Sequence, residues 1–193
     1  MENYLYSENS KKITRKDREN LLKQNAKVIW ITGLSASGKS TLAYELEQVL
    51  FSEGKLVQVL DGDQVRYGLN RDLSFSIIDR EENIRRIAEL AKILADTGII
   101  VICSFISPTK KIRAKAKAII GEQDFVEVFV DTPIEVCELR DPKGLYAKAR
   151  KREITNFTGV DAPYEAPEFP DIRITHERLP EISAKEIRDL ILK

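Results

Sequence analysis

The stretch that most constrains the fold of this chain is GLSASGKS, residues 33–40. It matches the pattern G-x-x-x-x-G-K-[ST] and lies between an apolar run, residues 27–32, and an amphipathic run, residues 40–54. A glycine-rich turn between a buried strand and a helix lets backbone N–H groups and the helix N-terminus surround phosphate oxygens. The stretch therefore predicts a phosphate-binding loop, or P-loop, at the end of a strand in an α/β fold.

The residue types within this loop suit a nucleoside triphosphate. Small side chains at positions 35–37 leave room for the phosphates, Lys39 would reach the β- and γ-phosphates, and Ser40 would place its hydroxyl on Mg²⁺. The flanking strand and helix argue against the alternative, a Gly/Ser turn that matches by chance. We expect contacts to the nucleoside triphosphate from Gly33, Leu34, Ser35, Ala36, Ser37, Gly38, Lys39, Ser40 and Thr41.

Apolar and amphipathic runs alternate along the rest of the chain. Apolar runs predict five strands, at residues 27–32, 55–61, 99–105, 125–131 and 171–175. Amphipathic runs predict a long helix from about Asp79 to Gly98 and another helix with Pro108 in its first turn. Strands that are apolar throughout, with helices between them, indicate a mainly parallel five-stranded sheet covered on both faces. This is the three-layer α/β/α sandwich of a P-loop NTPase.

The length of 193 residues suits one domain with two additions. Residues 1–26 lack the apolar core of a signal peptide and are predicted to be a charged, helical N-terminal extension. Residues 27–193 are the predicted P-loop domain. Within it, proline and glycine interrupt the alternation at about residues 140–168, which predicts an irregular lid over the nucleotide site.

Composition argues against several classes of function. The 31 Lys and Arg residues balance 31 Asp and Glu residues, so no overall charge draws the chain to nucleic acid or to an acidic membrane. No apolar run approaches the roughly 20 residues of a membrane span, and we expect a cytoplasmic protein. Cys103 and Cys137 lack metal-type spacing and are predicted to be reduced, buried thiols. The lone His176 is expected to have no catalytic role, so acid–base chemistry would need a carboxylate.

One basic run, KKIRAKAK at residues 110–117, could be taken for a nucleic-acid contact. On a helix, Lys110, Arg113 and Lys117 would share one face. We interpret this face as a solvated surface, and we expect no nucleic-acid partner.

A second charged cluster, VLDGDQVRYGLNRDL at residues 59–73, follows the P-loop. Asp61 ends the second predicted strand beside the expected γ-phosphate position, and Gly62 lets the chain turn before Asp63. Phosphoryl transfer to an alcohol needs Mg²⁺ to be held and the hydroxyl to be oriented. We expect Asp63 to orient the acceptor hydroxyl and take its proton, and Asp61 to lie near the metal. The alternative is that either carboxylate only caps the following helix.

Arg66, Arg80 and Asn83 supply hydrogen-bond donors after this turn. Guanidinium groups match phosphate or sulfate oxygens in pairs, so the donors predict an anionic acceptor. Arg85 and Arg86 are instead expected on a solvated helix face, paired with nearby glutamates. Because no N-K-x-D segment reads guanine and the chain is short for a motor or transporter ATPase, the sequence favours a small kinase.

Seven stretches make the chain resemble the adenylylsulfate kinases: IWITGLSASGKSTLA, LDGDQVRYGLNRDLSFS, DREENIRR, SFISP, VFVDTP, VCELRDPKGLYAKAR and FTGVDAPYEAP. They occur in the family's order, and the resemblance extends from about Ile13 to Pro167. It implies transfer of the γ-phosphoryl group of ATP to the 3′-hydroxyl of adenosine 5′-phosphosulfate, a step of sulfate activation and assimilation. It also implies ATP as co-substrate and Mg²⁺ as cofactor, the latter at Ser40 and Asp61.

The resemblance further implies roles for individual residues. Lys39, Asp63 and Ser107 would be catalytic, and Arg140 would face ATP. The family has been described with a phosphoserine at the position of Ser107, but we expect direct in-line transfer with Ser107 as a binding residue. Phe75 and Phe157 could stack on adenine or could simply belong to the core. The implied acceptor contacts are Asp63, Arg66, Phe75, Arg80, Asn83, Ile106, Ser107, Lys143, Leu145 and Phe157.

The chain departs from the family pattern at several positions. Ala36 replaces a glycine of the P-loop, and a methyl group is tolerated there if that residue keeps a negative φ. The other departures flank the predicted acceptor pocket and lid and bear on the choice of acceptor: Tyr67, Ser74, Thr109, Lys110, Arg152 and Thr155.

Two other functions stay open: a P-loop kinase of another small anionic metabolite, and a nucleotide-binding module without turnover. The expected partners are the small molecules ATP and adenylylsulfate. A homodimer through the N-terminal helix and a functional link to ATP sulfurylase also stay open, and neither nucleic acid nor a membrane is expected.

Overall fold

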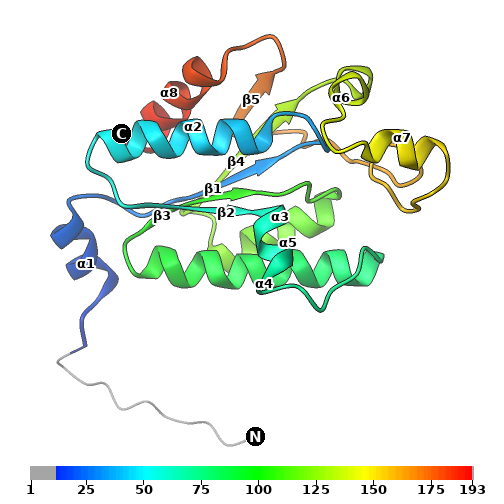
Figure 1. Ribbon diagram of the computed structural model, residues 1–193. Helices are drawn as coiled ribbons and strands as arrows, with labels where there is room; N and C mark the ends of the chain where they lie inside the picture. Colours follow the sequence, from blue (N-terminus) through cyan, green and yellow to red (C-terminus); the bar gives the residue numbers. More distant parts are fainter. Residues whose placement is uncertain (1–11, 193) are drawn as a thin grey trace, which may run out of the picture.

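The computed structural model describes residues 12–192, so residues 1–11 of the predicted N-terminal extension lie outside the described part. A central sheet lies between two layers of helices (Figure 1). The sheet has the strand order β2-β3-β1-β4-β5, and neighbouring strands pair in parallel. The predicted three-layer α/β/α sandwich with a five-stranded sheet is therefore confirmed.

The strands coincide with the predicted apolar runs, shortened by one or two residues at some ends. Their bounds are β1 Val28–Thr32, β2 Val57–Asp61, β3 Ile100–Ser104, β4 Phe125–Asp131 and β5 Ile172–Thr175. Every residue of the central strand β1 is buried. Its side chains alternate, with Val28 and Trp30 in one core and Ile29 and Ile31 in the other. A fully apolar strand thus serves both faces of the sheet.

Two long helices cover each face of the sheet (Figure 1). One face carries α2 (Lys39–Ser52) and α8 (Pro180–Ile191). The other face carries α4 (Ile77–Asp96) and α5 (Lys110–Ile120). The shorter helices are α1 (Arg15–Leu22), α3 (Gly62–Tyr67), α6 (Ile134–Arg140) and α7 (Leu145–Arg150). No helix within residues 12–192 combines the length and the apolarity needed to cross a membrane.

Helix α5 differs from its prediction in two ways. Pro108 does not lie in its first turn, because Thr109 is the N-cap and its hydroxyl accepts a hydrogen bond from the Ile112 N–H at 3.2 Å. The prediction of a solvated basic face is also wrong for one of its residues, Arg113. Arg113 is only 4% exposed, whereas Lys117 is exposed. The helix is rotated so that Arg113 faces the sheet, where it meets partners that the sequence pattern does not reveal.

Two further predictions concern the thiols and the lid. Cys103 and Cys137 are buried, free thiols, as predicted. Residues 141–170 follow an irregular path apart from α7 and a bridge between Thr158 and Ala162. That this segment acts as a lid stays a prediction.

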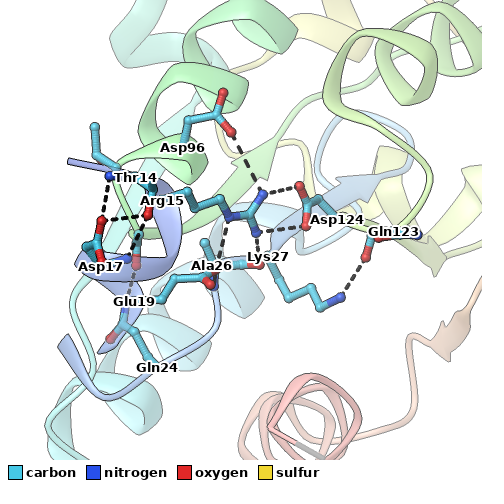
Figure 2. A network of polar contacts seen from close by, with 12 residues as sticks. Thr14, Arg15, Asp17, Glu19, Gln24, Ala26, Lys27, Asp96, Gln123 and Asp124 are labelled. Atoms are coloured by element: carbon cyan, nitrogen blue, oxygen red, sulfur yellow. Dashed lines mark hydrogen bonds and ion pairs between the residues drawn. The ribbon is translucent and has the colours of Figure 1, made fainter. Parts of the chain in front are cut away.

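Helix α1 lies at the edge of the sheet where the parallel strands begin, away from the P-loop (Figure 1), and Figure 2 shows the polar contacts that it makes there. Its Arg15 guanidinium donates to both carboxylate oxygens of Asp124, at 2.5 and 2.9 Å, just before β4. The same group donates to the Ala26 carbonyl at 2.9 Å, just before β1, and to Glu19 at 2.9 Å. One arginine therefore joins α1 to the starts of two strands.

Gln24 makes a similar connection to the starts of the edge strand β2 and its neighbour β3. Its side-chain amide accepts from the Leu56 N–H at 2.9 Å and donates to the Gly98 carbonyl at 2.8 Å. These residues precede β2 and β3. Residues 14–26 are thus part of the domain's packing at this edge, while the domain boundary after residue 26 stays a prediction.

We expect Arg15→Met to lower the free energy of unfolding by about 1 to 3 kcal/mol, because it leaves the Asp124 carboxylate without its partner. Substrate KM values should stay unchanged, since α1 lies at the opposite edge from the P-loop. Urea unfolding and steady-state kinetics would measure both quantities. Lys16→Met, an exposed change on the same helix, is the control. Equal stabilities of the two variants would contradict a stabilising role for the Arg15 contacts.

Candidate active site

The predicted site residues meet at the edge of the sheet where the strands end. A cavity of about 940 Å³ lies there, between the P-loop, the DGD turn after β2, the loop after β3 and the lid segment. Carboxyl ends of parallel strands share one edge of a sheet, which explains why residues far apart in sequence converge. The predicted site residues that line the cavity are Ser35, Ala36, Ser37, Gly38, Lys39, Ser40, Thr41, Asp61, Asp63, Arg66, Phe75, Arg80, Asn83, Ile106, Ser107, Arg140, Lys143, Leu145 and Phe157.

Gly33 and Leu34 do not line the cavity. They form the base of the P-loop, where Gly33 packs against β4. A side chain on Gly33 would place its Cβ 2.7 Å from the Val130 carbonyl oxygen, too close for any residue with a Cβ. Gly38 begins α2 with a φ of +108°, a second position that favours glycine. The loop's path thus depends on these two glycines.

The P-loop is held from outside through its carbonyl groups. Thr132 donates to the Ser37 carbonyl at 2.9 Å, and Arg140 donates to the same oxygen at 3.2 Å. Tyr146 of α7 donates to the Ser35 carbonyl at 3.0 Å. Sequence reasoning missed Thr132 and Tyr146, because a hydroxyl far along the chain carries no pattern that points to this loop.

Ala36 does not keep the negative φ that would make its methyl group harmless. Its φ is +59°, in the left-handed region that favours glycine. A left-handed conformation costs an L-residue about 1 to 2 kcal/mol. The contacts to the carbonyls on either side of Ala36 hold the loop in this shape despite the strain.

Lys39 and Ser40 point from the start of α2 into the cavity. The Lys39 side chain is 9% exposed, and its ammonium donates to the Leu34 carbonyl at 2.6 Å. Burial lowers the pKa of Lys39 to about 8. The Ser40 hydroxyl donates to Asp61 Oδ2 at 2.7 Å, so the two predicted metal-site residues lie together. A hydroxyl and a buried carboxylate oxygen are hard donors that fit Mg²⁺ with waters completing its shell.

The two carboxylates of the DGD turn have different surroundings. Asp61 is 6% exposed and also caps α3, because its Oδ1 accepts from the Asp63 N–H at 3.0 Å. The capping alternative is therefore correct for Asp61 and does not conflict with a metal role. Asp63 does not cap the helix; its side chain is 64% exposed and forms an ion pair with Lys143 of the lid segment. The lid segment thus contacts the carboxylate that we expect to handle the acceptor hydroxyl.

Arg66, Phe75 and Arg80 form a group on the wall beyond the DGD turn. The Arg66 guanidinium carbon lies 4.2 Å from the Phe75 ring centre, and that of Arg80 lies 5.8 Å from it. Phe75 is 61% exposed, so the core alternative is wrong for this ring. Burial lowers the pKa of Arg66, and burial together with the charge of Arg66 lowers the pKa of Arg80.

Two features make this wall suitable for an anion. Neither Arg66 nor Arg80 forms an ion pair within residues 12–192. Arg80 is nevertheless held in place, since it donates to the Thr158 hydroxyl at 3.1 Å and to the Asn156 carbonyl at 2.7 Å. Partly buried guanidinium groups without carboxylate partners are poised for a phosphate or sulfate. Arg85 and Arg86, by contrast, pair with Glu82 as expected.

Asn83 adds a further donor to this wall. It is 5% exposed, and its Oδ1 accepts from Nδ2 of Asn70 at 2.9 Å, which leaves its own N–H₂ group toward the cavity. Asn70 is fully buried and was not predicted from the sequence. Phe157 lines the cavity edge-on to the Tyr146 ring, with the centroids 4.9 Å apart. Phe157 is half-buried, so it both packs against α7 and faces the cavity.

Ser107 is not arranged as a nucleophile. It is 2% exposed and has a φ of +38°. Its hydroxyl accepts from Trp30 Nε1 at 3.1 Å and donates to Thr32 Oγ1 at 3.1 Å. An indole and a hydroxyl are not bases, and a serine nucleophile needs a base beside it.

The remaining family departures lie outside the cavity lining. Tyr67 is 88% exposed, and the Ser74 hydroxyl bonds to the Asp79 carboxylate. Thr109 caps α5. Arg152 has a positive φ, of +60°. His176, in contrast, does line the cavity, on the side of β5.

Comparison with known proteins agrees with this geometry. The family model for adenylylsulphate kinase matches residues 25–175 of the chain. An adenylyl-sulfate kinase of Bacteroides thetaiotaomicron is 52% identical over 191 residues, which are 98% of this chain and 95% of that protein. An adenylyl-sulfate kinase of Clostridium acetobutylicum is 58% identical over 163 residues, 84% of this chain and 81% of that protein.

A solved structure is also similar to this chain. The Mycobacterium tuberculosis APS kinase CysC in complex with AMPPNP and APS is 49% identical and has a TM-score of 0.85. The match covers 88% of this chain and 99% of that chain. The P-loop, the DGD turn, Arg66 and Arg80 thus occur in a fold and a sequence that are shared over most of their length, and this chain belongs to the adenylylsulphate kinase family.

Proposed function

We propose that the protein is an adenylylsulfate kinase, which transfers the γ-phosphoryl group of ATP to the 3′-hydroxyl of adenosine 5′-phosphosulfate. The observation that carries this proposal is the group of Arg66, Phe75 and Arg80 across the cavity from the P-loop. An aromatic face beside two arginines that have no carboxylate partner within residues 12–192 fits a ligand that is both a nucleoside and an anion. Membership of the family supports the same acceptor.

The P-loop side of the cavity is the proposed ATP site. Residues 33–41 would surround the phosphates, with Lys39 on the transferred group and Arg140 beside the loop. Ser40 and Asp61 would hold Mg²⁺, which when bound neutralises charge on the phosphate oxygens. The Ser40–Asp61 hydrogen bond supports this assignment, because it brings the two oxygens of the proposed metal site together.

Asp63 is the proposed group that orients the acceptor hydroxyl and takes its proton. Within the described residues, the Asp63 carboxylate forms an ion pair with the ammonium group of Lys143. A bound acceptor would place its hydroxyl against Asp63 and its anionic groups near Lys143 and the arginines. The buried, hydrogen-bonded Ser107 hydroxyl supports direct in-line transfer, with Ser107 as part of the pocket wall.

Two alternatives give different outcomes in the same experiments. A kinase of another small anionic metabolite would use the P-loop but would not need Phe75 exposed beside the arginines. A nucleotide-binding module without turnover would not need an exposed carboxylate at Asp63. A homodimer, a functional link to ATP sulfurylase and a cytoplasmic location stay predictions.

The direct test is incubation with ATP, Mg²⁺ and adenylylsulfate. We expect ADP and the 3′-phosphorylated product in equal amounts, separated and quantified by anion-exchange chromatography. Gluconate and shikimate are the comparison acceptors. Phosphorylation of one of these, with no product from adenylylsulfate, would exclude the proposed function.

Asp63→Asn should lower kcat by about a hundredfold or more, because the amide cannot take the hydroxyl proton. The KM for ATP should change little, since the P-loop contacts do not involve Asp63. Initial-rate kinetics with each substrate varied would measure both. Asp72→Asn, which removes a carboxylate paired with Arg86 outside the cavity, is the matched control. An unchanged kcat for Asp63→Asn would remove Asp63 from this role.

Nucleotide binding should take up a proton near pH 8. The pKa of Lys39 is lowered to about 8 by burial, and bound phosphates favour its charged form and so raise this pKa. Affinity for ADP should therefore fall as the pH rises above 8, and proton uptake should vanish at pH 6.5, where Lys39 is already charged. Calorimetric titration in buffers of different ionisation enthalpy measures the uptake. Lys39→Met should abolish it, and uptake that persists in this variant would assign the proton to another group.

A further inference from the structure

Arg113 is a buried cation outside the proposed catalytic machinery, and its three donor nitrogens have three separate partners. Nε lies 2.9 Å from a carboxylate oxygen of Glu127 on β4. Nη1 donates to the Ser107 carbonyl at 2.9 Å, and Nη2 donates to the Glu165 carbonyl at 2.7 Å. The residue thus connects a strand, the loop after β3 and the end of the lid segment. An arginine can do this because its donors diverge in a rigid plane.

The first connection holds a strained part of the cavity wall. Ile106 and Ser107 line the cavity, and Ser107 has a φ of +38°. A non-glycine residue in this region persists only when its surroundings determine it. Arg113 donates to the Ser107 carbonyl, and Trp30 and Thr32 bond to the Ser107 hydroxyl. Thr32 also donates to the Ile106 carbonyl at 2.7 Å.

The second connection holds the end of the lid segment. The Glu165 N–H donates to the Pro108 carbonyl at 2.8 Å, and the Glu165 carboxylate accepts from the Lys110 N–H at 2.8 Å. Tyr164 places its hydroxyl 3.0 Å from Thr32 Oγ1, and its ring centre lies 5.9 Å from the Arg113 guanidinium carbon. Residues 164–165 are therefore attached to the loop that carries Ile106 and Ser107.

We propose that Arg113 is a positioning residue that joins the acceptor wall, Ile106 and Ser107, to the end of the lid segment, Tyr164 and Glu165. The P-loop is held by other side chains, from Thr132, Arg140 and Tyr146. Loss of the Arg113 contacts should therefore weaken the acceptor side and spare the ATP side. The identity of the acceptor rests on the proposed function, whereas the connection itself does not.

A purely structural role is the competing explanation. Burial raises the pKa of Glu127, and the charge of Arg113 opposes this effect, so the pair could act only as a buried ion pair. Substitution of Arg113 by lysine distinguishes a positioning role from a purely structural one. The single ammonium group of lysine can keep the charge beside Glu127 but cannot also reach both carbonyls.

The kinetic test compares Arg113→Lys with Lys115→Met, an exposed change on the same helix. For Arg113→Lys we expect a KM for adenylylsulfate about tenfold higher, which corresponds to about 1.4 kcal/mol, the size of one or two lost hydrogen bonds. The KM for ATP should stay within about twofold of the wild-type value, and Lys115→Met should match the wild type in both. A wild-type acceptor KM in Arg113→Lys, or an equal rise in both KM values, would overturn the proposal.

A second test needs no substrate. Hydrogen–deuterium exchange of the free protein should be faster in Arg113→Lys at residues 104–109 and 160–168 together, since one side chain holds both segments. Exchange in α2 should be unchanged in this variant and in Lys115→Met. Faster exchange in neither segment, or in only one, would overturn the proposal. Absence of wild-type turnover with adenylylsulfate would instead count against the proposed function, and exchange would still decide the role of Arg113.

Discussion

Burial of β1 in the middle of a parallel sheet is the constraint on which the rest of the structure depends. The strand pairs with β3 on one side and β4 on the other, and all its residues are inside. Parallel pairing brings the strand ends to one edge, so the P-loop, the DGD turn and the loop after β3 must meet there. The side chains of Trp30 and Thr32 also reach Ser107, so β1 supports the acceptor wall as well as the phosphate loop.

The site divides into two halves that are supported separately. The phosphate half is held through its carbonyl groups by residues after β4, which allow Ala36 to keep a strained conformation. The acceptor half is held by β1 and Arg113, and there Ser107 is strained. Ala36 in one half and Ser107 in the other are thus non-glycine residues in the left-handed region, held by hydrogen bonds from outside their loops. Pre-formed walls of this kind reduce the ordering that substrate binding requires.

The strands and most site residues were predictable because local pattern is enough for them. Apolar runs determine β-strands, and the glycine and lysine spacing of a phosphate loop follows from the shape of phosphate groups. The solvated position predicted for Arg113 is wrong, and the negative φ set as a condition for Ala36 is not met; both depend on the neighbours of the residue. The φ of Ala36 depends on distant hydroxyl and guanidinium groups, and the burial of Arg113 depends on Glu127 and on two carbonyls from separate loops. Helical spacing alone places a basic residue on the solvated face, because it contains no information about such distant partners.

The sequence by itself determined the α/β class, the position of the phosphate loop and the family, because these depend on periodicity and on short motifs. Only the tertiary structure decided which polar groups are shared between segments. Asp61 both caps α3 and meets Ser40, Phe75 is exposed beside Arg66 and Arg80, and Arg113 joins the acceptor wall to the lid segment. Such arrangements join residues far apart along the chain, and hydrogen-bond partners at that separation leave no periodic signal in the sequence.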